Sequence, residues 1–336
     1  MGIFYWHFGD YSLLPDVSPA ERARMALQAL PLAQVGDVVY VPPGEAQGLA
    51  GLFMAHLHSS GLARGVDTTD QLGCNLESCQ VSVRIYGSEA VRRLGDPKYH
   101  TYTDQLSDRR SFQALVADSG WPVVPTYQSK GGTVQLMPNV VVKAMRGREE
   151  HRLSSERALD CSRRVIQPNL SGAVFYHYHY HAGQVCLVQS SQDALGFTRV
   201  ELGPAEHLEL VSNEAERGPG VLLRVYGFNT YSLRVAVLPS TNEVLWDACF
   251  PGYHETLYPA LVAKRLGLGN EWHYERVSLL SPLQFARIES NLIGRSQSGG
   301  LLVIDLNQGL CRPGVLFSGG LDERRRQRAL LSKLHQ

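Results

Sequence analysis

Two cations in the middle of the chain stand at positions suited to binding an anion. Arg109 lies in the first turn of an expected helix, where a positive charge opposes the helix dipole and favours an external anion as its partner. Lys143 follows three consecutive valines, so its ammonium is held on a stiff strand. The pair predicts a small site for phosphate oxygens, whereas an exposed arginine and a lysine that reaches solvent are the ordinary alternatives.

Near the end of the chain, oxygen-bearing side chains follow a buried strand. Asp305 and Asn307 are two residues apart, so on a strand they project from the same face. Carboxylate and amide oxygens are hard ligands that suit Mg²⁺. A strand that ends in a turn capped by Asn307 explains the same residues without a metal.

A third candidate is an alternating run of tyrosine and histidine at residues 176–181. A strand would place His177, His179 and His181 on one face, where three imidazoles could bind Zn²⁺ or a redox metal. The same alternation is typical of a half-exposed strand whose aromatic side chains point inward. The run therefore leaves open a metal-dependent enzyme and an ordinary sheet strand.

The periodicity of hydrophobic residues along the chain predicts the helices and strands that position these side chains. A helix at 108–119 would begin after Ser107 and end at Gly120, and its neighbour 121–125 would be extended because it contains Pro122 and Pro125. The other expected elements are helices at 19–30, 255–266 and 322–334, a strand pair around Gly183, and strands at 37–41, 139–144, 221–226, 231–238, 243–248 and 301–307.

The composition excludes several classes of protein. The 336 residues contain 32 Lys+Arg and 32 Asp+Glu, and this balance argues against a broad surface for nucleic acid or anionic membranes. Six scattered cysteines without a CxxC pair indicate reduced thiols, and no apolar run reaches the roughly 18 residues of a membrane span. Glycine-rich phosphate-loop, HExxH and GxSxG motifs are absent. We therefore expect a cytoplasmic protein with no nucleic-acid or membrane partner.

The order of the remaining motifs resembles the ATP-grasp superfamily of carboxylate–amine and peptide ligases. The resemblance rests on SDRRSF at 107–112, GWPVVP at 120–125, VVVKA at 140–144 and VIDLN at 303–307. It implies an α/β protein of the α+β grasp type, with a Rossmann-like pre-ATP-grasp lobe at 1–103. A central ATP-grasp subdomain would follow at 104–228, with an elaborated segment at 146–220. A C-terminal ATP-grasp subdomain at 229–336 would carry the metal and substrate site.

The resemblance also assigns roles to individual residues. Two hinges could hold adenine, at 166–172 and at 221–227, and the second is preferred because the later elements follow it at compact distances. The resemblance implies that ATP is bound by Arg109, Lys143, Arg224 and Val225. It implies that Lys143 and Arg234 are catalytic, with Arg234 as the clamp for the substrate carboxylate. It implies that Mg²⁺ is bound by Asp305, Asn307 and Glu289.

The implied activity is amide or peptide-like bond formation through an acyl phosphate. ATP and Mg²⁺ would be the cofactors, and the partners would be a small carboxylate, such as an amino acid, and an amine, as in natural-product biosynthesis. A homodimer is a possible assembly. Two alternatives stay open: a metal-dependent enzyme that uses His177, His179 and His181, and a degenerate ATP-grasp protein that binds or scaffolds.

Overall fold

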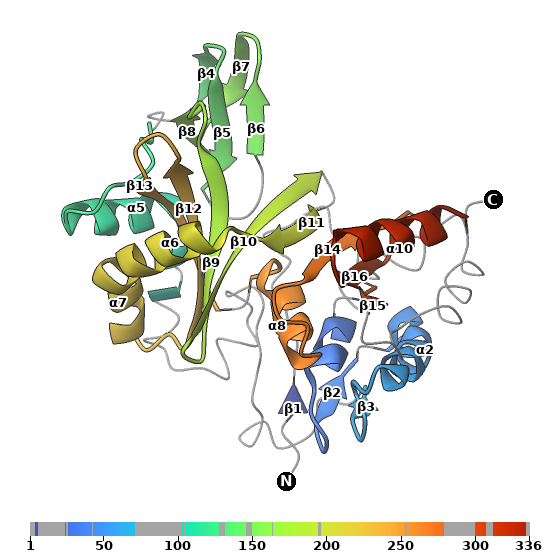
Figure 1. Ribbon diagram of the computed structural model, residues 1–336. Helices are drawn as coiled ribbons and strands as arrows, with labels where there is room; N and C mark the ends of the chain where they lie inside the picture. Colours follow the sequence, from blue (N-terminus) through green and yellow to red (C-terminus); the bar gives the residue numbers. More distant parts are fainter. Residues whose placement is uncertain are drawn as a thin grey trace. The chain divides into compact units, whose positions relative to one another are not determined.

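The structure is a computed structural model, shown in Figure 1. It describes residues 4–5, 24, 26–41, 43–70, 102–103, 105–127, 132–145, 150–162, 164–193, 196–252, 254–278, 300–306 and 312–333. The chain packs into two compact units. Unit 1 contains residues 1–94, 190–202 and 255–336, and unit 2 contains residues 95–189 and 203–254. The expected boundary between 228 and 229 falls inside unit 2.

The first part of unit 1 is a small parallel sheet beside helices. Strands β1 (Phe4–Tyr5), β2 (Val38–Tyr40) and β3 (Asp67–Thr69) pair in that order, and both pairings are parallel. Helix α2 (Glu45–Ser59) runs between β2 and β3. The expected strand at 37–41 is confirmed. Within the expected helix at 19–30, Arg24 is α-helical and residues 26–30 belong to the 3-10 helix η2 (Ala26–Leu32), which contains Pro31.

The rest of unit 1 is antiparallel. Strands β11 (Gly196–Leu202), β14 (Trp272–Arg276), β16 (Gly314–Ser318) and β15 (Leu301–Asp305) pair in that order. Helices α8 (Leu257–Arg265) and α10 (Leu321–Lys333) confirm the helices expected at 255–266 and 322–334. Every residue of β15 and β16 is buried, because these strands form the interior of the unit.

Unit 2 is built on long antiparallel strands. Strands β9 (Val174–His181) and β10 (Gln184–Asp193) form the expected hairpin around Gly183, and β10 passes into unit 1 after residue 189. Strand β12 (Thr230–Leu238) pairs with β9 on one side and with β13 (Glu243–Pro251) on the other. The expected strands at 231–238 and 243–248 are confirmed, and the second is longer than predicted.

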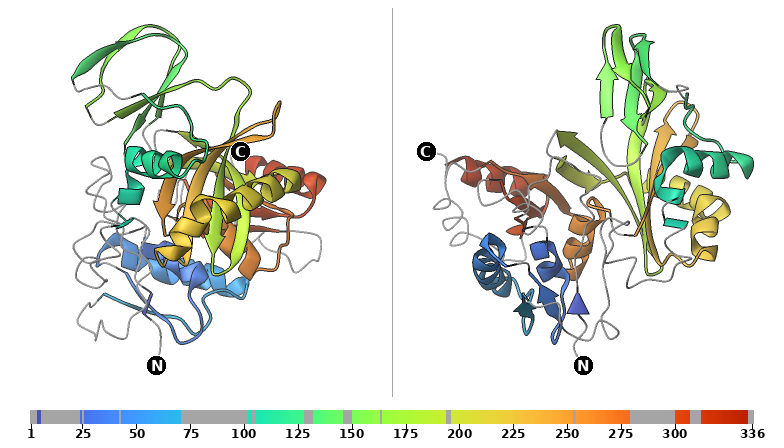
Figure 2. Two further views of the ribbon diagram at one scale, coloured as in Figure 1. Left: turned by 90° about the vertical axis from the view of Figure 1, so that its left-hand side faces the viewer. Right: turned by 180° about the vertical axis from the view of Figure 1, so that it is seen from behind.

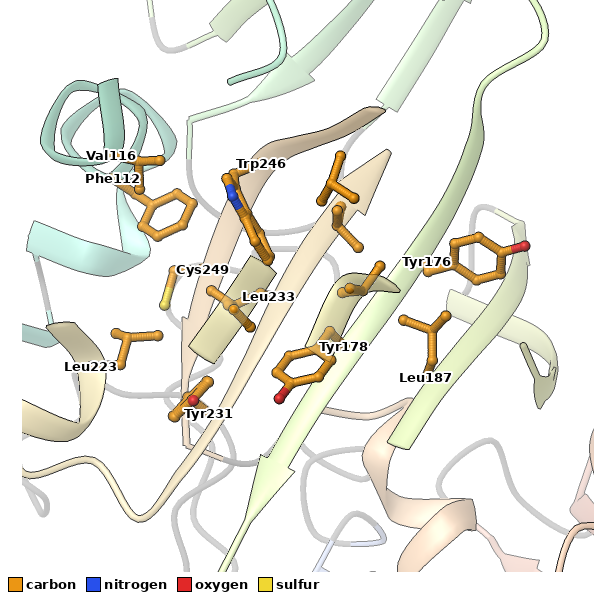
Figure 3. Close-up of a cluster of buried hydrophobic side chains, with 14 of the residues drawn as sticks. Phe112, Val116, Tyr176, Tyr178, Leu187, Leu223, Tyr231, Leu233, Trp246 and Cys249 are labelled. Atoms are coloured by element: carbon orange, nitrogen blue, oxygen red, sulfur yellow. The ribbon is translucent and has the colours of Figure 1, made fainter. Parts of the chain in front are cut away.

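Three helices cover one face of these strands. Helices α5 (Arg109–Asp118), α6 (Ala205–Arg217) and α7 (Pro219–Val225) lie on one side of β9, β12 and β13 in Figures 1 and 2. The hydrophobic core between them is drawn in Figure 3. Its members alternate along the strands and include Tyr176, Tyr178, Tyr231, Leu233 and Trp246. The opposite faces of β9 and β12 therefore carry the alternate residues.

Two smaller sheets complete unit 2. Strand β5 (Val140–Ala144) pairs with β6 (Glu150–Leu153) and β8 (Arg164–Pro168), and β4 (Thr133–Leu136) pairs with β7 (Arg157–Asp160). The expected strand at 139–144 is confirmed. The extended segment at 121–125 is also confirmed, and the Val124 amide donates to the carbonyl of Trp246 in β13. No helix in the described part of the chain is long and apolar enough to span a membrane.

Two local predictions were wrong. The N-cap of α5 is Asp108 rather than Ser107, because the Asp108 carboxylate accepts the amide of Ser111 at 3.1 Å. The segment at 221–226 is not a strand. Residues 221–225 belong to helix α7, which begins at Pro219 and buries Leu223 in the core, and Tyr226 is its C-cap.

Candidate functional site

The candidate site lies where β13 is interrupted by a β-bulge. Val235 pairs with Trp246 and Arg234 pairs with Ala248, so Asp247 is an extra residue on β13 without a partner in the β12 register. Bulges re-aim side chains and are frequent next to active sites. Asp247 is fully buried in the middle of an apolar strand, and a buried carboxylate requires charged or hydrogen-bonding partners.

Three cations from different elements meet the Asp247 carboxylate within the described part of unit 2. Lys143 Nζ on β5 lies 2.9 Å from Oδ2, Arg234 Nε on β12 lies 3.5 Å from Oδ2, and Arg109 Nε on α5 lies 3.4 Å from Oδ1. Gln167 on β8 donates its side-chain amide to Oδ1 at 2.7 Å. We call Arg109, Lys143 and Arg234 around Asp247 the cation cluster. Three of the four cations that the sequence suggested for the site are therefore brought together, and Arg224 is the exception.

Helix α5 fixes one side of the cation cluster. Arg109 and Gln113 are four residues apart and share a helix face, and Gln113 donates to the main-chain carbonyl of Asp247 at 3.0 Å. The start of the helix is also tied to the end of the lysine-bearing strand. The Arg109 guanidinium donates to the Ala144 carbonyl at 2.5 Å, and its main-chain amide donates to Met145 at 2.9 Å. The positions of Arg109 and Lys143 are thus coupled through the backbone.

The electrostatics keep Asp247 ionised. Burial alone would raise the pKa of its carboxyl, but Lys143, Arg109 and Arg234, together with the Gln167 hydrogen bond, hold that pKa well below its usual range. At neutral pH the four charged side chains therefore carry three positive charges and one negative charge, a formal sum of +2. A group of cations held this close together is typical of sites that bind a multiply charged anion.

Arg234 forms the more accessible rim of the cation cluster. Its side chain is 16% exposed, against 2% for Lys143 and 0% for Asp247. The ring of Phe175 on β9 lies beneath both heads, with its centroid 4.8 Å from Lys143 Nζ and 5.0 Å from the Arg234 guanidinium carbon. An incoming ligand would therefore meet Arg234 before the more deeply buried ammonium.

The preferred adenine hinge is not near the cation cluster in the fold. Arg224 lies on α7, where it pairs with Glu216 at 2.7 Å and stacks over the Tyr180 ring. Tyr180 packs against the helix-covered core, whereas Arg234 projects from the other face of β12. Val225 is also on α7 and is 76% exposed. The expected hinge strand at 221–227 is thus replaced by a helix on the opposite face.

The other hinge candidate lies beside the lysine. β8 pairs with β5 so that Gln167 is opposite Val141 and Val165 is opposite Lys143. The Gln167 side chain reaches Asp247 directly and also donates to Thr126 at 3.0 Å. Gln167 of this hinge candidate is therefore in direct contact with the cation cluster.

Of the expected metal ligands, Asp305 is described, and it belongs to unit 1. Its carboxylate forms an ion pair with Arg276 at 2.7 Å and accepts the Tyr274 hydroxyl at 3.1 Å. Glu289 and Asn307 lie outside the described residues. The carboxylate of Asp305 is thus engaged within its own unit, on β15, which pairs with β16 in the sheet that also contains β14.

The alternating histidines are part of the same sheet face as Arg234. Tyr176 and Tyr178 enter the core, so His177, His179 and His181 project from the other side of β9. His179 hydrogen-bonds with Ser232 at 2.6 Å, and His181 does so with Thr230 at 2.8 Å. His177 stacks on His254 with ring centroids 4.6 Å apart. The face therefore consists of stacked and hydrogen-bonded rings.

Burial keeps the imidazoles of His177 and His179 neutral. It lowers the pKa of His179 to about 3, and burial followed by repulsion from Arg234 lowers the pKa of His177 well below its usual value. Among the described residues, no group of three or more His, Cys, Asp or Glu side chains is arranged to hold a metal ion. The described part of the chain thus lends no support to a histidine metal centre.

The cation cluster does not fit a protein-held magnesium ion either. Both oxygens of Asp247 already contact cations or the Gln167 amide, whereas Mg²⁺ needs oxygen ligands at about 2.0–2.1 Å in octahedral geometry. A metal on this carboxylate would have to displace those groups and lie among three cations of the described structure.

Asp247 and Gln167 are the site residues that sequence reasoning missed. A signal for Asp247 was present, because it is a single acid in the apolar run of the strand expected at 243–248. Such a buried charge requires a partner, and Arg234 on the expected neighbouring strand was an available one. Gln167 belongs to one of the two expected hinges, but its sequence position does not reveal that its side chain donates to Asp247.

Comparison with solved structures defines the class of fold. The chain resembles PurK, N5-carboxyaminoimidazole ribonucleotide synthetase, in its ADP complex, with a TM-score of 0.52 and 10% identity over 98% of this chain and 96% of that one. It also resembles phosphoribosylglycinamide synthetase from Anaerococcus prevotii, with a TM-score of 0.51 and 7% identity over 99% and 98%. No protein-family model and no curated protein matches the sequence. The chain has the ATP-grasp fold.

Proposed function

We propose that this protein is an ATP-dependent carboxylate–amine ligase whose nucleotide phosphates bind at the cation cluster. The observation that carries the proposal is the meeting of Arg109, Lys143 and Arg234 at one buried carboxylate. The ATP-grasp fold supports it, because the solved structures of similar fold include synthetases, one in an ADP complex. The proposal includes a Rossmann-like lobe before the grasp and a small acid, such as an amino acid, as substrate.

The proposed reaction has two steps. A substrate carboxylate oxygen attacks the γ-phosphorus of ATP, the bond to the β-phosphate oxygen breaks, and an acyl phosphate and ADP form. An amine nitrogen then attacks the acyl carbon, inorganic phosphate leaves, and the amine loses a proton to give the amide. Phosphoryl transfer depends mainly on positioning and charge stabilisation, so cations rather than a covalent nucleophile are the expected catalytic groups.

Each member of the cation cluster has a role in this scheme. The Lys143 ammonium and the Arg109 guanidinium would stabilise charge on the phosphate oxygens, and Arg234 at the rim would bind the transferred phosphoryl group or the substrate carboxylate. Asp247 would act as a positioning residue, because it holds all three cations without being exposed to the ligand. We propose residues 166–172 as the adenine hinge, since Gln167 joins β8 to the cluster.

The test is ADP release from ATP in the presence of paired panels of small carboxylic acids and amines. We expect release to require both an acid and an amine, and a Lys143→Ala variant to lose at least about a hundredfold in rate, as for loss of one preorganised donor. Lys264→Ala is the matched control, because Lys264 is an exposed lysine on α8. A Lys143→Ala protein that folds and retains the wild-type rate would contradict the proposal.

A second candidate is a nucleotide-binding protein without turnover. Two observations favour it: both oxygens of Asp247 are engaged, and Asp305 is held in an ion pair with Arg276. This candidate predicts that ATP raises the melting temperature while no acid and amine pair increases ADP release. ADP release that depends on a substrate pair would contradict it.

A further inference from the structure

A second group of charged side chains lies in unit 1, on the face of β14 that is turned away from Asp305. Tyr274 donates its hydroxyl to the Asp305 carboxylate. The alternate residues of β14, His273 and Glu275, therefore project from the other face of the strand. Helix α10 brings two arginines to the His273 ring on that face. We call His273, Glu275, Arg324 and Arg328 the α10 cluster.

Both nitrogens of the buried His273 ring face a guanidinium. Arg324 Nη1 lies 3.4 Å from Nδ1, and Arg328 Nη2 lies 3.2 Å from Nε2. A guanidinium only donates hydrogen bonds, and a neutral imidazole offers only one acceptor nitrogen. Glu275 resolves the conflict on one side, because its carboxylate accepts from Arg328 at 2.5 Å and lies 3.6 Å from Nε2. The Nε2 hydrogen therefore faces this carboxylate, and Nδ1 is left opposite Arg324.

Arg324 is the arginine of α10 whose charge is not balanced by the described residues. Arg325 and Arg326 each pair with an acid three residues earlier on the helix, and Arg328 pairs with Glu275. In the described part of the chain, Arg324 has no carboxylate partner, and its buried Nε–H has no hydrogen-bond acceptor. A buried donor without an acceptor costs free energy. An anion beside Arg324 would supply both the missing acceptor and the missing charge.

The strands on either side of β14 do not supply that charge. The register of β11 places Glu201 beside His273 and Arg199 beside Glu275, but Glu201 and Arg199 pair with each other at 2.8 Å. On the other side, Phe317 of β16 stacks on the His273 ring with the ring centroids 4.7 Å apart. With His273 neutral, the α10 cluster and the β11 pair hold three arginines and two glutamates, a formal sum of +1.

We propose that Arg324 and His273 bind a small oxyanion, the phosphate or carboxylate group of a ligand, together with a proton. The anion accepts hydrogen bonds from the Arg324 guanidinium. A proton from solvent binds Nδ1, so the ring donates to the anion from Nδ1 and faces Glu275 with Nε2–H. The anion and the proton favour each other's binding, because each reduces the electrostatic cost of the other.

The protonation of His273 provides the readout for this site. Burial and the charges of Arg328 and Arg324, opposed by Glu275, lower the pKa of His273 in the protein without an anion. A bound anion should therefore move the titration of this ring back to higher pH. The site lies in unit 1 and its readout is not ADP release, so its failure and the failure of the proposed ligase are distinguishable.

NMR titration of the His273 ring tests the proposal, with the ring signals assigned by comparison with a His273→Gln variant. Sulfate stands in for a phosphate group, because its charge does not change over the range in which histidine titrates, and acetate stands in for a carboxylate. We expect sulfate, acetate or both to raise the titration midpoint by about one pH unit relative to chloride at the same ionic strength. The probe that acts identifies the class of ligand. The same midpoint in all three salts would overturn the proposal.

Variants on α10 make the test specific. Arg324→Gln should abolish the difference between the salts, and in chloride it should raise the midpoint because one repelling charge is gone. Arg324→Lys should keep part of the difference, since it retains the charge but loses the planar fork. Arg325→Gln is the matched control, because Arg325 is exposed and pairs with Asp322, and it should titrate as wild type. Thermal unfolding without an anion shows that each variant folds. A difference between the salts that persists in Arg324→Gln would overturn the proposal.

Discussion

Two buried carboxylates, one in each unit, are stabilised in different ways. In unit 1, Asp305 on β15 contacts Arg276 and Tyr274, which both lie on β14 of the same antiparallel sheet. In unit 2, Asp247 is contacted by cations from β5, α5 and β12 and by an amide from β8. Asp305 therefore joins strands of a single sheet, whereas Asp247 is the meeting point of five separate elements.

The difference shows how a buried acid can serve either packing or ligand binding. A carboxylate paired with a guanidinium and a hydroxyl is a structural contact whose charges cancel. A carboxylate that gathers several cations instead organises them as a group of like charges, an arrangement that suits the binding of an anion. We expect substitutions at Asp247 to respond to added polyphosphate and equivalent substitutions at Asp305 not to respond.

The largest expected effect comes from removing the central acid. Asp247→Asn leaves Lys143 and Arg109 buried beside an uncharged amide, which should lower the free energy of unfolding by about 3–5 kcal/mol. Urea denaturation followed by circular dichroism measures the loss. Tripolyphosphate should restore part of it, because a bound anion replaces the lost charge. A variant as stable as wild type would show that Asp247 does not hold the cations.

The corresponding substitution in unit 1 should lower the free energy of unfolding by a somewhat smaller amount. Asp305→Asn leaves the 4% exposed Arg276 side chain without its carboxylate, so we expect a loss of about 3 kcal/mol in the same denaturation experiment. Tripolyphosphate should not restore this loss. Equal recovery of both variants would remove the distinction between the two carboxylates.

Acidification should affect both units through buried histidines. Burial lowers the pKa of His179 to about 3 in unit 2, and burial, opposed by the carbonyl of Val303, lowers the pKa of His56 to about 4 in unit 1. Between these values and the unfolded pKa of about 6.5, the unfolded chain binds more protons, so stability falls as the pH falls. Between pH 7 and pH 5, each histidine should lower the free energy of unfolding by about 2 kcal/mol.

Histidine variants separate the two contributions. His179→Gln and His56→Gln should each reduce the loss of stability between pH 7 and 5, as measured by urea denaturation at both pH values. Asp247 should not contribute to this change. Its lowered pKa stabilises the fold at every pH above the pKa of Asp in the unfolded chain, about 3.9, and this contribution is lost only below that pH. An unchanged pH dependence in both variants would contradict the assignment.

The smallest effect is expected at the arginine-rich helix α10. The ion pair between Arg325 and Asp322 has side chains that are 69% and 85% exposed. Such pairs contribute little, so Arg325→Ala should change the free energy of unfolding by less than about 0.5 kcal/mol. Urea denaturation provides the measurement. A loss of stability comparable with that of Asp305→Asn would show that the exposure of these arginines does not predict how much their ion pairs stabilise the fold.

Local patterns predicted most of the elements around the site. The valine run predicted β5 and the position of Lys143, and the alternation of tyrosine and histidine predicted the two faces of β9. A strand was wrongly predicted at 221–226 because the β-branched residues of this run favour a strand. Pro219, however, is positioned to begin a helix, and Leu223 is buried when that helix forms. Tertiary packing thus overruled the propensity of this segment.

The sequence by itself determined the order of the motifs that resemble the ATP-grasp superfamily, most of the separate strands and helices, and the identity of the three cations that contact Asp247. The tertiary structure decided that these cations meet at Asp247, that Gln167 joins them, and that Arg224 lies on the opposite face. The physical reason is that a strand pattern specifies which face a residue occupies, but not its register against a partner strand. The bulge between Trp246 and Ala248 shifts that register by one residue, so that Arg234 pairs with Ala248 rather than with Asp247, and the pattern of one strand alone does not reveal such a shift.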